Sequence, residues 1–304
     1  MESWGAFVPS STIEQNYPLK ENTWWKVGGP AEFYTEPSTL EDVEAALAWA
    51  KEKGLAVTIL GGGTNVLISD EGVKGLVLCT KKFRGYEVNE SDDEIEMVCW
   101  AGTPKSDLLK VFLQKQLSPA VFLTGLPGDV AGGVVMNAGV GEEKTPREFC
   151  EIVKWVEVYD YAASSPVIRR VSTKDISWEY RHSSGWQPGF ITRVSVAWPN
   201  QPDPEVMSEV RKKNKHRLST QPIHQPSGGS TFRNPPGHKA AKLIDDCGLK
   251  GFHIGGAMVS EKHANFIVNT GSATADDIKI VIDHVQKVVQ EKTGVTLTPE
   301  VITL

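Results

Sequence analysis

The chain has 304 residues, of which 40% are hydrophobic, and a formal net charge of -6. This length allows two or three domains with buried cores, and it excludes a small scaffold that depends on disulfides. The charge is mildly acidic and the longest basic run is Arg211-Lys212-Lys213, which argues against a nucleic-acid partner and favours a small molecule.

The cysteines and the N-terminal residues indicate where such a chain works. Neither C-x-x-C spacing nor histidines at zinc-ligand intervals are present, so we predict no metal site and free, mostly buried thiols. Residues 1–11 lack a charged n-region and an apolar h-region, and no later apolar run reaches membrane-spanning length. We therefore expect a cytoplasmic protein in a reducing compartment. The cysteines are Cys79, Cys99, Cys150 and Cys247.

Helix and strand patterns alternate in the first half of the chain. A helix is predicted over 40–53, with Ser38 and Glu41 in capping-box register. A second helix is predicted over 104–116, with Thr103 as its N-cap and Pro104 at its first position. Between them, two short β-type runs at 56–60 and 66–69 flank a glycine loop at 61–65.

A second glycine-rich stretch runs from Leu123 to Gly139, which is too rich in glycine for ordinary core and indicates backbone kept clear for a ligand. Mainly β structure is then predicted over 152–198, with a hairpin around 162–166. Pro202 lies in a break that predicts a domain boundary.

The last third of the chain follows that break. A charged helix is predicted over 205–218, and two further helices over 240–247 and 275–292 enclose two strands in an α+β layer. The final run, 295–304, has a strand pattern and is too short for a domain, so we expect it to join a sheet elsewhere.

The glycine loop at 61–65 fits neither common phosphate motif. Val66 stands where a Rossmann fingerprint needs its third glycine, and no glycine loop in the chain ends in Gly-Lys-Ser/Thr. Successive unhindered N–H groups can still bind pyrophosphate, although a tight strand connection explains one such loop equally well. Because the chain has a second glycine-rich stretch, one extended ligand bound by both is a better interpretation than a tight strand connection.

Ser230 follows two glycines, Gly228 and Gly229, within a polar segment that continues to Pro235. Adjacent glycines let a substrate approach a hydroxyl closely, and such a hydroxyl could donate a proton. The alternative is a tight surface turn, because Ser, Gly, Asn and Pro are the residues that turns prefer.

Six motifs occur in order over about 22–301, and together they resemble the UDP-N-acetylenolpyruvoylglucosamine reductases of bacterial cell-wall synthesis. They are LGGGTNVLISD, LTGLPGDVAGGVVMNAG, WEYRHSS, PSGGSTFRNPPGHKAAKLID, EKHANFIVN and TPEV. The short stretch between Arg181 and Ser230 resembles the compact second class of that family, which lacks an inserted loop with a substrate-clamping tyrosine.

The resemblance implies an α+β fold with a FAD-binding domain of the vanillyl-alcohol-oxidase/p-cresol-methylhydroxylase type, made of two α/β subdomains, and a C-terminal α+β substrate-binding domain. We expect the first FAD-binding subdomain at 1–75, joined by a C-terminal strand at 296–304. The second is expected at 76–201 and the substrate-binding domain at 202–295.

The resemblance also implies a reaction. Hydride passes from NADPH to FAD and then to the enolpyruvyl group of UDP-N-acetylglucosamine enolpyruvate, which gives UDP-N-acetylmuramate. By motif match, Arg181 grips the substrate carboxylate, Ser230 protonates the enolic carbon and Glu300 helps to stabilise the enol. From the residues alone, an exposed strand side chain is the favoured interpretation of Arg181 and the usual one for a glutamate such as Glu300.

Further site residues are implied in two groups. The expected flavin contacts are Gly61, Gly62, Gly63, Thr64, Asn65, Gly125, Pro127, Gly128, Gly132, Asn137, Ala138 and Gly139. The expected substrate contacts are Arg217, Asn234, Lys262 and His263. The family usually continues Asn-Ala-Gly with Ala-Tyr-Gly-Gly, whereas this chain continues with Val140-Gly141-Glu142-Glu143, so the flavin contacts of the loop at 139–145 stay open.

Two other functions remain open at this point. The same FAD scaffold could serve an oxidase or dehydrogenase of another hydroxy acid or sugar. A module without enzymatic activity could use the glycine loops only to bind a nucleotide. The oligomeric state, for which a monomer is favoured, the preference for NADPH over NADH and the protonation state of Glu300 are also open.

Overall fold

The computed structural model describes residues 12–140, 145–163 and 165–304. Within them the chain divides into two compact units, each built from separate stretches. Unit 1 contains residues 12–14, Phe33–Gly62 and Gly75–Asn214, and unit 2 contains Gln15–Glu32, Gly63–Lys74 and Lys215–Leu304. Helix α5 (Val206–Thr220) runs from the first unit into the second.

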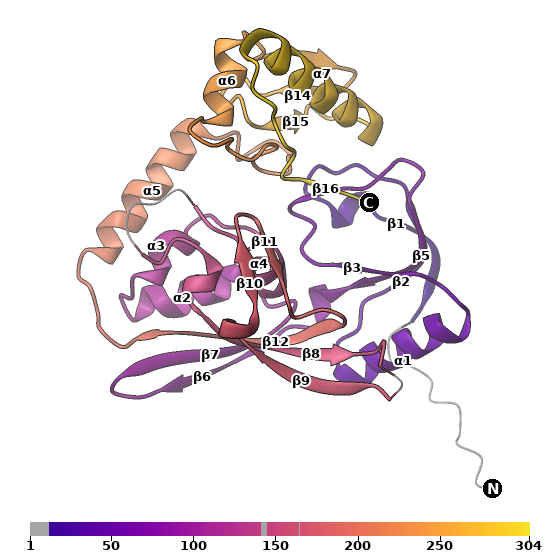
Figure 1. Cartoon of the computed structure of the whole chain (residues 1–304), viewed down its shortest axis with the longest axis vertical. Coiled ribbons are helices and arrows are strands. Elements are labelled where there is room, and N and C mark those ends of the chain that lie inside the picture. The colour runs from indigo at the N-terminus through magenta and orange to yellow at the C-terminus, as the bar shows by residue number, and fades with distance from the viewer. Residues whose placement is uncertain (1–11, 141–144, 164) are drawn as a thin grey trace, which may run out of the picture. The chain divides into compact units, whose positions relative to one another are not determined.

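Unit 1 is built on a five-stranded antiparallel sheet of order β6-β7-β12-β8-β9 (Figure 1). Strands β2, β5 and β3 are neighbours in a second sheet, in which β3 and β5 are parallel. The hairpin β10–β11 completes the strands of this unit. Strands β2 (Pro30–Thr35) and β5 (Val73–Cys79) begin in unit 2 and end in unit 1. The other strands are β3 (Val57–Leu60), β6 (Tyr86–Glu90), β7 (Glu94–Trp100), β8 (Val153–Asp160), β9 (Val167–Ser172), β10 (Ser177–Glu179), β11 (His182–Ser184) and β12 (Phe190–Pro199).

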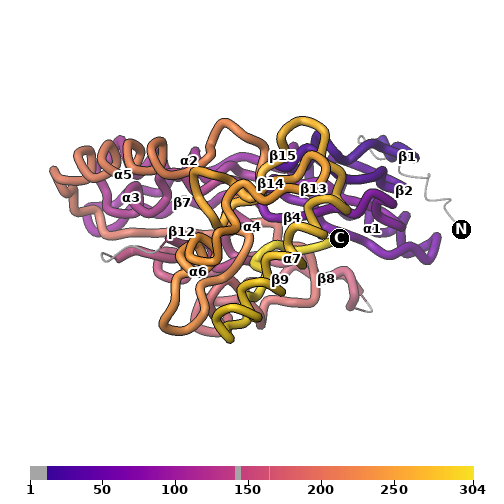
Figure 2. Tube along the Cα trace, turned by 90° about the horizontal axis from the view of Figure 1, so that it is seen from above, coloured from indigo at the N-terminus to yellow at the C-terminus, as the bar shows by residue number. Residues whose placement is uncertain are grey.

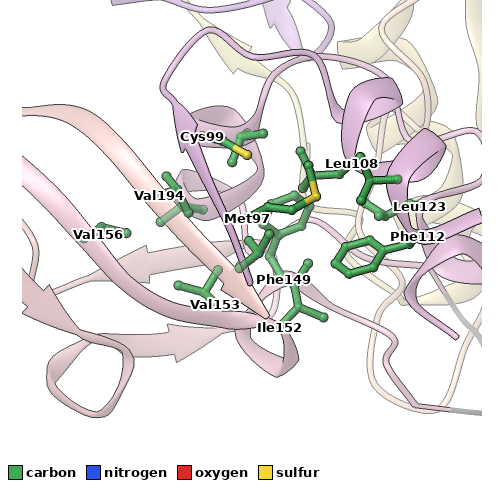
Figure 3. Packing of buried hydrophobic residues seen from close by; sticks show 14 of the residues in the cluster. Met97, Cys99, Leu108, Phe112, Leu123, Phe149, Ile152, Val153, Val156 and Val194 are labelled. Atoms are coloured by element: carbon green, nitrogen blue, oxygen red, sulfur yellow. The ribbon is translucent and has the colours of Figure 1, made fainter. Parts of the chain in front are cut away.

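Helices α2 (Lys105–Gln114), α3 (Pro119–Leu123) and α4 (Val130–Val135) cover one face of the five-stranded sheet (Figure 1). Their apolar side chains meet those of the sheet in one core, in which Phe112 of α2 and Phe149 lie beside Met97 of β7 (Figure 3). Helix α1 packs with Phe190 and Tyr159 in a second core. Helix α1 spans Leu40–Glu52.

Unit 2 packs the long helix α7 against a three-stranded antiparallel sheet of order β13-β14-β15 (Figure 2). Its core also takes Trp25, Val27 and Leu67 from the two upstream stretches. The elements are β1 (Glu14–Pro18), β4 (Val66–Leu67), α6 (Ala240–Asp246), β13 (His253–Ile254), β14 (Ala257–Val259), β15 (Ile267–Asn269), α7 (Ala275–Thr293) and β16 (Ile302–Thr303).

Several sequence predictions are confirmed. Helix α7 begins behind Thr274, whose hydroxyl forms a capping box with Asp277. A hairpin joins β8 and β9, although Ser164 of its turn lies outside the described residues, as do residues 1–11 and 141–144. The C-terminal run does join a sheet, since β16 pairs in parallel with β4, but the strand covers only Ile302–Thr303.

Both early helix caps were predicted one residue away from the observed ones. Thr39, not Ser38, caps α1, because its hydroxyl is in register with the N–H of Asp42. Helix α2 starts at Lys105 with Pro104 as the extended N-cap residue. The hydroxyl of Thr103 is engaged elsewhere, because it donates to Gly85 O at 2.7 Å.

The second glycine-rich stretch was interpreted as clear backbone, yet part of it is helix α4. Val130 and Val134 bury their side chains in the core of unit 1. Gly133 is required by packing, since a Cβ there would lie 2.4 Å from the Phe149 ring. Among the described residues, no helix is long and apolar enough to cross a membrane.

Candidate active site

The carboxylate of Asp129 joins the two glycine loops of unit 1. Its Oδ2 accepts a hydrogen bond from Gly62 N–H at 2.6 Å, and its Oδ1 accepts one from Gly132 N–H at 2.6 Å as the N-cap of α4. The loops also touch directly, because a Cβ on Gly62 would lie 2.9 Å from the Cα of Gly128. Gly61 and Gly62 therefore form one backbone surface with the second loop.

A buried lysine lies beside this junction. The N–H of Lys105 donates to Gly128 O at 3.0 Å, and its ammonium group lies 5.5 Å from the centroid of the Phe149 ring. Burial lowers the pKa of Lys105 to about 8, while the negative charge of Asp129 acts in the opposite direction. Lys105 thus adds a buried cationic side chain close to Asp129, and no motif pointed to it.

Arg181 belongs to the same unit and sits at the tip of the β10–β11 hairpin. Its φ of 58° is left-handed, a conformation that a non-glycine residue seldom adopts outside tight turns and functional sites. Its Nη2 donates to Gly139 O at 2.8 Å, and its guanidinium stacks 4.6 Å from the Tyr180 ring centroid. The side chain is only 12% exposed, so the alternative of an exposed strand residue is wrong.

Asn137, an expected flavin contact, is buried, and its side chain is engaged with protein. Its amide donates to Glu148 Oε2 at 2.9 Å and to Glu179 O at 3.1 Å, and it accepts from Cys150 N at 3.0 Å. Glu148 in turn lies 3.6 Å from Arg181 Nη1. Asn137 therefore orients the surroundings of Arg181.

Ser230 lies in unit 2, in a segment that pairs with the C-terminal residues. Glu300 N donates to Thr231 O at 2.8 Å, and Arg233 N donates to Thr298 O at 2.9 Å. An antiparallel bridge between Phe232 and Pro299 lies between these two bonds. The pairing brings Ser230 and Glu300 into neighbouring positions, which the sequence alone could not establish.

The two glycines before Ser230 are required for different structural reasons. Gly228 lies against the buried ring of Trp25, where a Cβ would approach within 2.5 Å. Gly229 has open space around it and a φ of 80°. Ser230 itself is half-buried, and its hydroxyl forms no hydrogen bond within the part of the chain that the structure describes.

Asn65, another expected flavin contact, holds the C-terminal segment. Its Nδ2 donates to Glu300 O at 3.1 Å, and its backbone oxygen accepts from Ile302 N at 3.0 Å. The neighbouring Gly63 is fixed by packing, since a Cβ there would lie 1.9 Å from Asn22 O. The part of the first glycine loop that belongs to unit 2 therefore supports Glu300.

The expected substrate contacts all lie in unit 2, and several already have protein partners. Arg217 Nε donates to Gln221 Oε1 at 3.0 Å, and burial lowers its pKa. Lys262 Nζ donates to Leu218 O at 2.6 Å, in the same last turn of α5. The exposed Asn234 accepts from Ala240 N at 3.0 Å at the start of α6.

His263 is partly buried, and burial lowers its pKa, with the nearby Lys250 contributing in the same direction. Its Nδ1 accepts from Asn265 N at 3.3 Å. Asn265 was missed as a separate candidate, although it lies in the EKHANFIVN motif. Within the described ranges, no group of three His, Cys, Asp or Glu side chains could hold a metal ion.

Comparison with known proteins decides the family. A model described as "UDP-N-acetylenolpyruvoylglucosamine reductase, C-terminal domain" matches residues 221–304, and a FAD binding domain model matches residues 31–165. A UDP-N-acetylenolpyruvoylglucosamine reductase of Synechococcus sp. (strain CC9311) is 38% identical, with 97% of this chain and 94% of the relative covered. The chain belongs to the UDP-N-acetylenolpyruvoylglucosamine reductase family.

Other members of the family agree with this assignment. The reductase of Moorella thermoacetica is 38% identical, over 94% of this chain and 91% of its own length. The crystal structure of the reductase from Thermus caldophilus superposes with a TM-score of 0.78 at 30% identity and covers 96% of this chain and 99% of its own. These matches confirm the resemblance and the fold class, a FAD-binding domain followed by the family's C-terminal domain.

The residues present fit FAD. At Gly62 and Gly128 the two loops of unit 1 approach each other with no intervening side chain. Such half-buried glycine backbone can offer N–H groups to a pyrophosphate without a Rossmann helix, apart from the N–H of Gly62, which binds Asp129. Gly61, Gly62, Gly125, Pro127 and Gly128 would hold the cofactor there, beside the positive charge of Lys105.

Proposed function

We propose that this protein reduces the enolpyruvyl group of UDP-N-acetylglucosamine enolpyruvate with NADPH, through bound FAD, to give UDP-N-acetylmuramate. Overall, NADPH supplies a hydride, one proton is taken up, the alkene becomes a lactyl ether and NADP⁺ is released. The observation that carries the proposal is the pairing of the Ser230 segment with Thr298–Glu300 in a member of this family. It brings the backbone segment of Ser230 next to the segment that carries Glu300, which supports a site with a hydroxyl and a carboxyl group.

When FAD is bound, it carries the hydride from the nicotinamide to the alkene. Hydride addition leaves negative charge on the substrate carbon next to the carboxylate, which cationic and acidic groups must stabilise. Arg181 is suited to hold that carboxylate, because its guanidinium is always charged and offers forked donors. Its contacts to Gly139 and Tyr180 fix the side chain in advance.

Ser230 is the proposed proton donor, and Glu300 stabilises the enol next to it. A serine hydroxyl is a weak acid, so its contribution depends on accurate placement and on neighbouring acidic groups. Thr231 and Arg233 are fixed by backbone bonds to the residues around Glu300. The backbone segments that carry the two groups are therefore held in one register.

The remaining assignments follow from this role. We propose FAD-binding subdomains at 1–75, with the strand at 296–304, and at 76–201, and a substrate-binding domain at 202–295. The reaction belongs to peptidoglycan synthesis, and so to cell-wall biogenesis, cell shape and division, in the bacterial cytoplasm. Arg217, Asn234, Lys262 and His263 are proposed substrate contacts, and the protein is proposed to act as a monomer.

The test follows the absorbance of the bound flavin in a stopped-flow instrument, first with NADPH and then with the enolpyruvyl nucleotide. The Ser230→Ala variant should be reduced by NADPH at the wild-type rate. Its reoxidation by the nucleotide should be slower by roughly 10²- to 10⁴-fold, because only that step protonates carbon. Ser227→Ala, in the same segment, is the control and should retain both rates.

Wild-type flavin that the enolpyruvyl nucleotide does not reoxidise would refute the proposed reaction. A Ser230→Ala variant that slows both half-reactions equally would refute the role of the hydroxyl. An oxidase of a hydroxy acid or sugar would instead show flavin reduction by that alcohol without NADPH.

A further inference from the structure

Asn265 is buried, with 4% of its surface exposed, and both ends of its side-chain amide bind the same residue. Its Nδ2 donates to Phe232 O at 2.8 Å, and its Oδ1 accepts from Phe232 N at 3.0 Å. Its backbone oxygen accepts from Thr231 N at 2.8 Å. One residue thus makes three hydrogen bonds to the two positions directly after Ser230.

The same two positions are bound from the C-terminal segment. Thr231 O accepts from Glu300 N, and Phe232 forms a bridge with Pro299. The backbone around Ser230 is therefore fixed by Asn265 as well as by the strand that carries Glu300. Any shift of Phe232 must move the start of that strand pair.

We infer that Asn265 is a positioning residue that sets Ser230 and Glu300 in register for proton delivery. The inference rests on the proposed function, and it assigns to Asn265 no contact with substrate or flavin. Phe232 is 2% exposed, so its N–H and C=O cannot turn to water when the amide is removed. A buried backbone group without a partner is costly, so the strand would shift to find one.

An amide side chain supplies the hydrogen-bond donor and acceptor that Phe232 needs at every pH. Phe232 presents one donor and one acceptor, and the carboxamide of asparagine supplies the complementary pair. An ionised aspartate can accept from Phe232 N–H, but it has no hydrogen to donate to Phe232 O. A protonated aspartate regains that donor, which makes Asn265→Asp a pH-dependent version of the same contact.

Asn269 provides a matched control in the same unit. It is 6% exposed, its Nδ2 donates to Trp25 O at 2.8 Å and its Oδ1 accepts from Gly271 N at 2.8 Å and from Ala273 N at 3.1 Å. Its burial and its kind of hydrogen bonds match those of Asn265. Its side chain binds neither the Ser230 strand nor the strand of Glu300.

The first experiment measures both flavin half-reactions in the FAD-loaded Asn265→Ala and Asn269→Ala proteins. Asn265→Ala should keep the wild-type rate of reduction by NADPH, and its reoxidation by the enolpyruvyl nucleotide should be roughly 10- to 100-fold slower, since small misplacements of reacting groups have effects of that size. Asn269→Ala should lose comparable thermal stability and keep the wild-type rate of reduction and most of the rate of reoxidation, because its amide binds Trp25 O and not the backbone of Phe232.

The second experiment follows reoxidation of the Asn265→Asp and Asn269→Asp variants from about pH 8 to about pH 5. Burial raises the pKa of a carboxyl group at such a position, so Asn265→Asp should regain roughly tenfold in rate as the pH falls. His263 faces the Asn265 N–H and titrates in every variant, so each rate is divided by the wild-type rate at the same pH. The ratio for Asn269→Asp should stay flat.

A third measurement needs no turnover. Amide hydrogen exchange of Thr231 and Glu300 should be faster in Asn265→Ala than in Asn269→Ala, because only the first loosens that pairing. Equal exchange in the two variants, equal loss in both half-reactions, or a flat pH ratio for Asn265→Asp would overturn the inference. Inactive wild-type enzyme would instead refute the proposed reaction, and the positioning role with it.

Discussion

The flavin loops of unit 1 and the Ser230 strand of unit 2 are supported in different ways. In unit 1, ionised or buried polar side chains bind loop backbone, with Asp129 between the two glycine loops and Asn137 behind Arg181. In unit 2, the Ser230 segment is held by neutral hydrogen bonds to another stretch of backbone and to Asn265. Hydrogen bonds to an ionised side chain change with pH. Strand pairing changes instead when one strand shifts its register against the other.

The largest effect that this comparison predicts concerns Lys105. Its pKa is about 8 in the folded protein against 10.5 for an ordinary lysine, so the unfolded chain binds more protons between these pH values. The cost in folding free energy of burying the charged Lys105 has its full value below about pH 8 and disappears as the pH rises towards 10.5. It amounts to at most on the order of 3 kcal/mol.

The free energy of unfolding of Lys105→Met should therefore exceed that of the wild type by the largest amount near neutral pH, and this difference should shrink as the pH rises. Urea unfolding at several pH values measures this. Lys242→Met removes an exposed lysine of unit 2 whose pKa is raised by its ion pair with Asp246, so its difference from wild type should not change between neutral pH and pH 10.5. Parallel pH profiles for Lys105→Met and wild type would show that the flavin loops do not cover a buried charge.

Gly228→Ala tests the packing of the Ser230 strand. The new Cβ would meet the ring of Trp25, which is fixed by a hydrogen bond from its Nε1 to Ile267 O at 2.7 Å. Overpacking of this kind costs about 1–3 kcal/mol, and the segment before Ser230 must shift. Thermal unfolding should show the loss, with reoxidation of flavin slowed more than reduction; unchanged stability would mean that the ring yields.

Asp129→Ala tests the junction of the two glycine loops. Loss of the N-cap of α4 should cost about 1–2 kcal/mol, and FAD should bind more weakly because Gly62 loses its partner. Thr274→Ala removes the cap of α7 and should cost a similar free energy without changing FAD affinity. Titration of apoprotein with FAD measures the difference, and equal affinity in both variants would contradict the role of Asp129.

Gly229→Ala should have the smallest effect of the series. No atom lies within 4 Å of the added methyl group, so only the left-handed φ opposes it, at a cost of about 1 kcal/mol. Thermal unfolding compares it with Gly228→Ala. A loss as large as that of Gly228→Ala would indicate that backbone conformation, and not contact with Trp25, governs this segment.

Sequence patterns predicted the long elements well, because their periodicity is local. Helix α7 and its cap at Thr274 are of this kind. Helix α4 was missed because two of its six residues are glycine, and tertiary packing against Phe149 outweighs their low helix propensity. The predicted cap at Ser38 was wrong because Thr39 is in better register with Asp42, and the predicted cap at Thr103 was wrong because its hydroxyl binds Gly85.

The order of the motifs predicted which residues belong to the candidate site, but not which of their segments pair. Ser230 and Glu300 were named from motifs, but no local rule predicts that Thr231 pairs with Glu300, because strand pairing depends on long-range packing. Asn65 and Asn137 stay predicted flavin contacts, and the structure adds that their amides bind Glu300 O and the Glu148 carboxylate. A motif identifies positions that matter without separating ligand contacts from the residues that support them.

The discontinuous build of unit 2 limits how its parts can be exchanged between proteins. Residues 221–304 match a family model by themselves, yet the core around them includes Trp25, Val27 and Leu67 from two upstream stretches. A gene fragment cut at the boundary of that match would encode a core with an indole-sized hole. Recombination that preserves the Ser230 strand must therefore transfer all three stretches together.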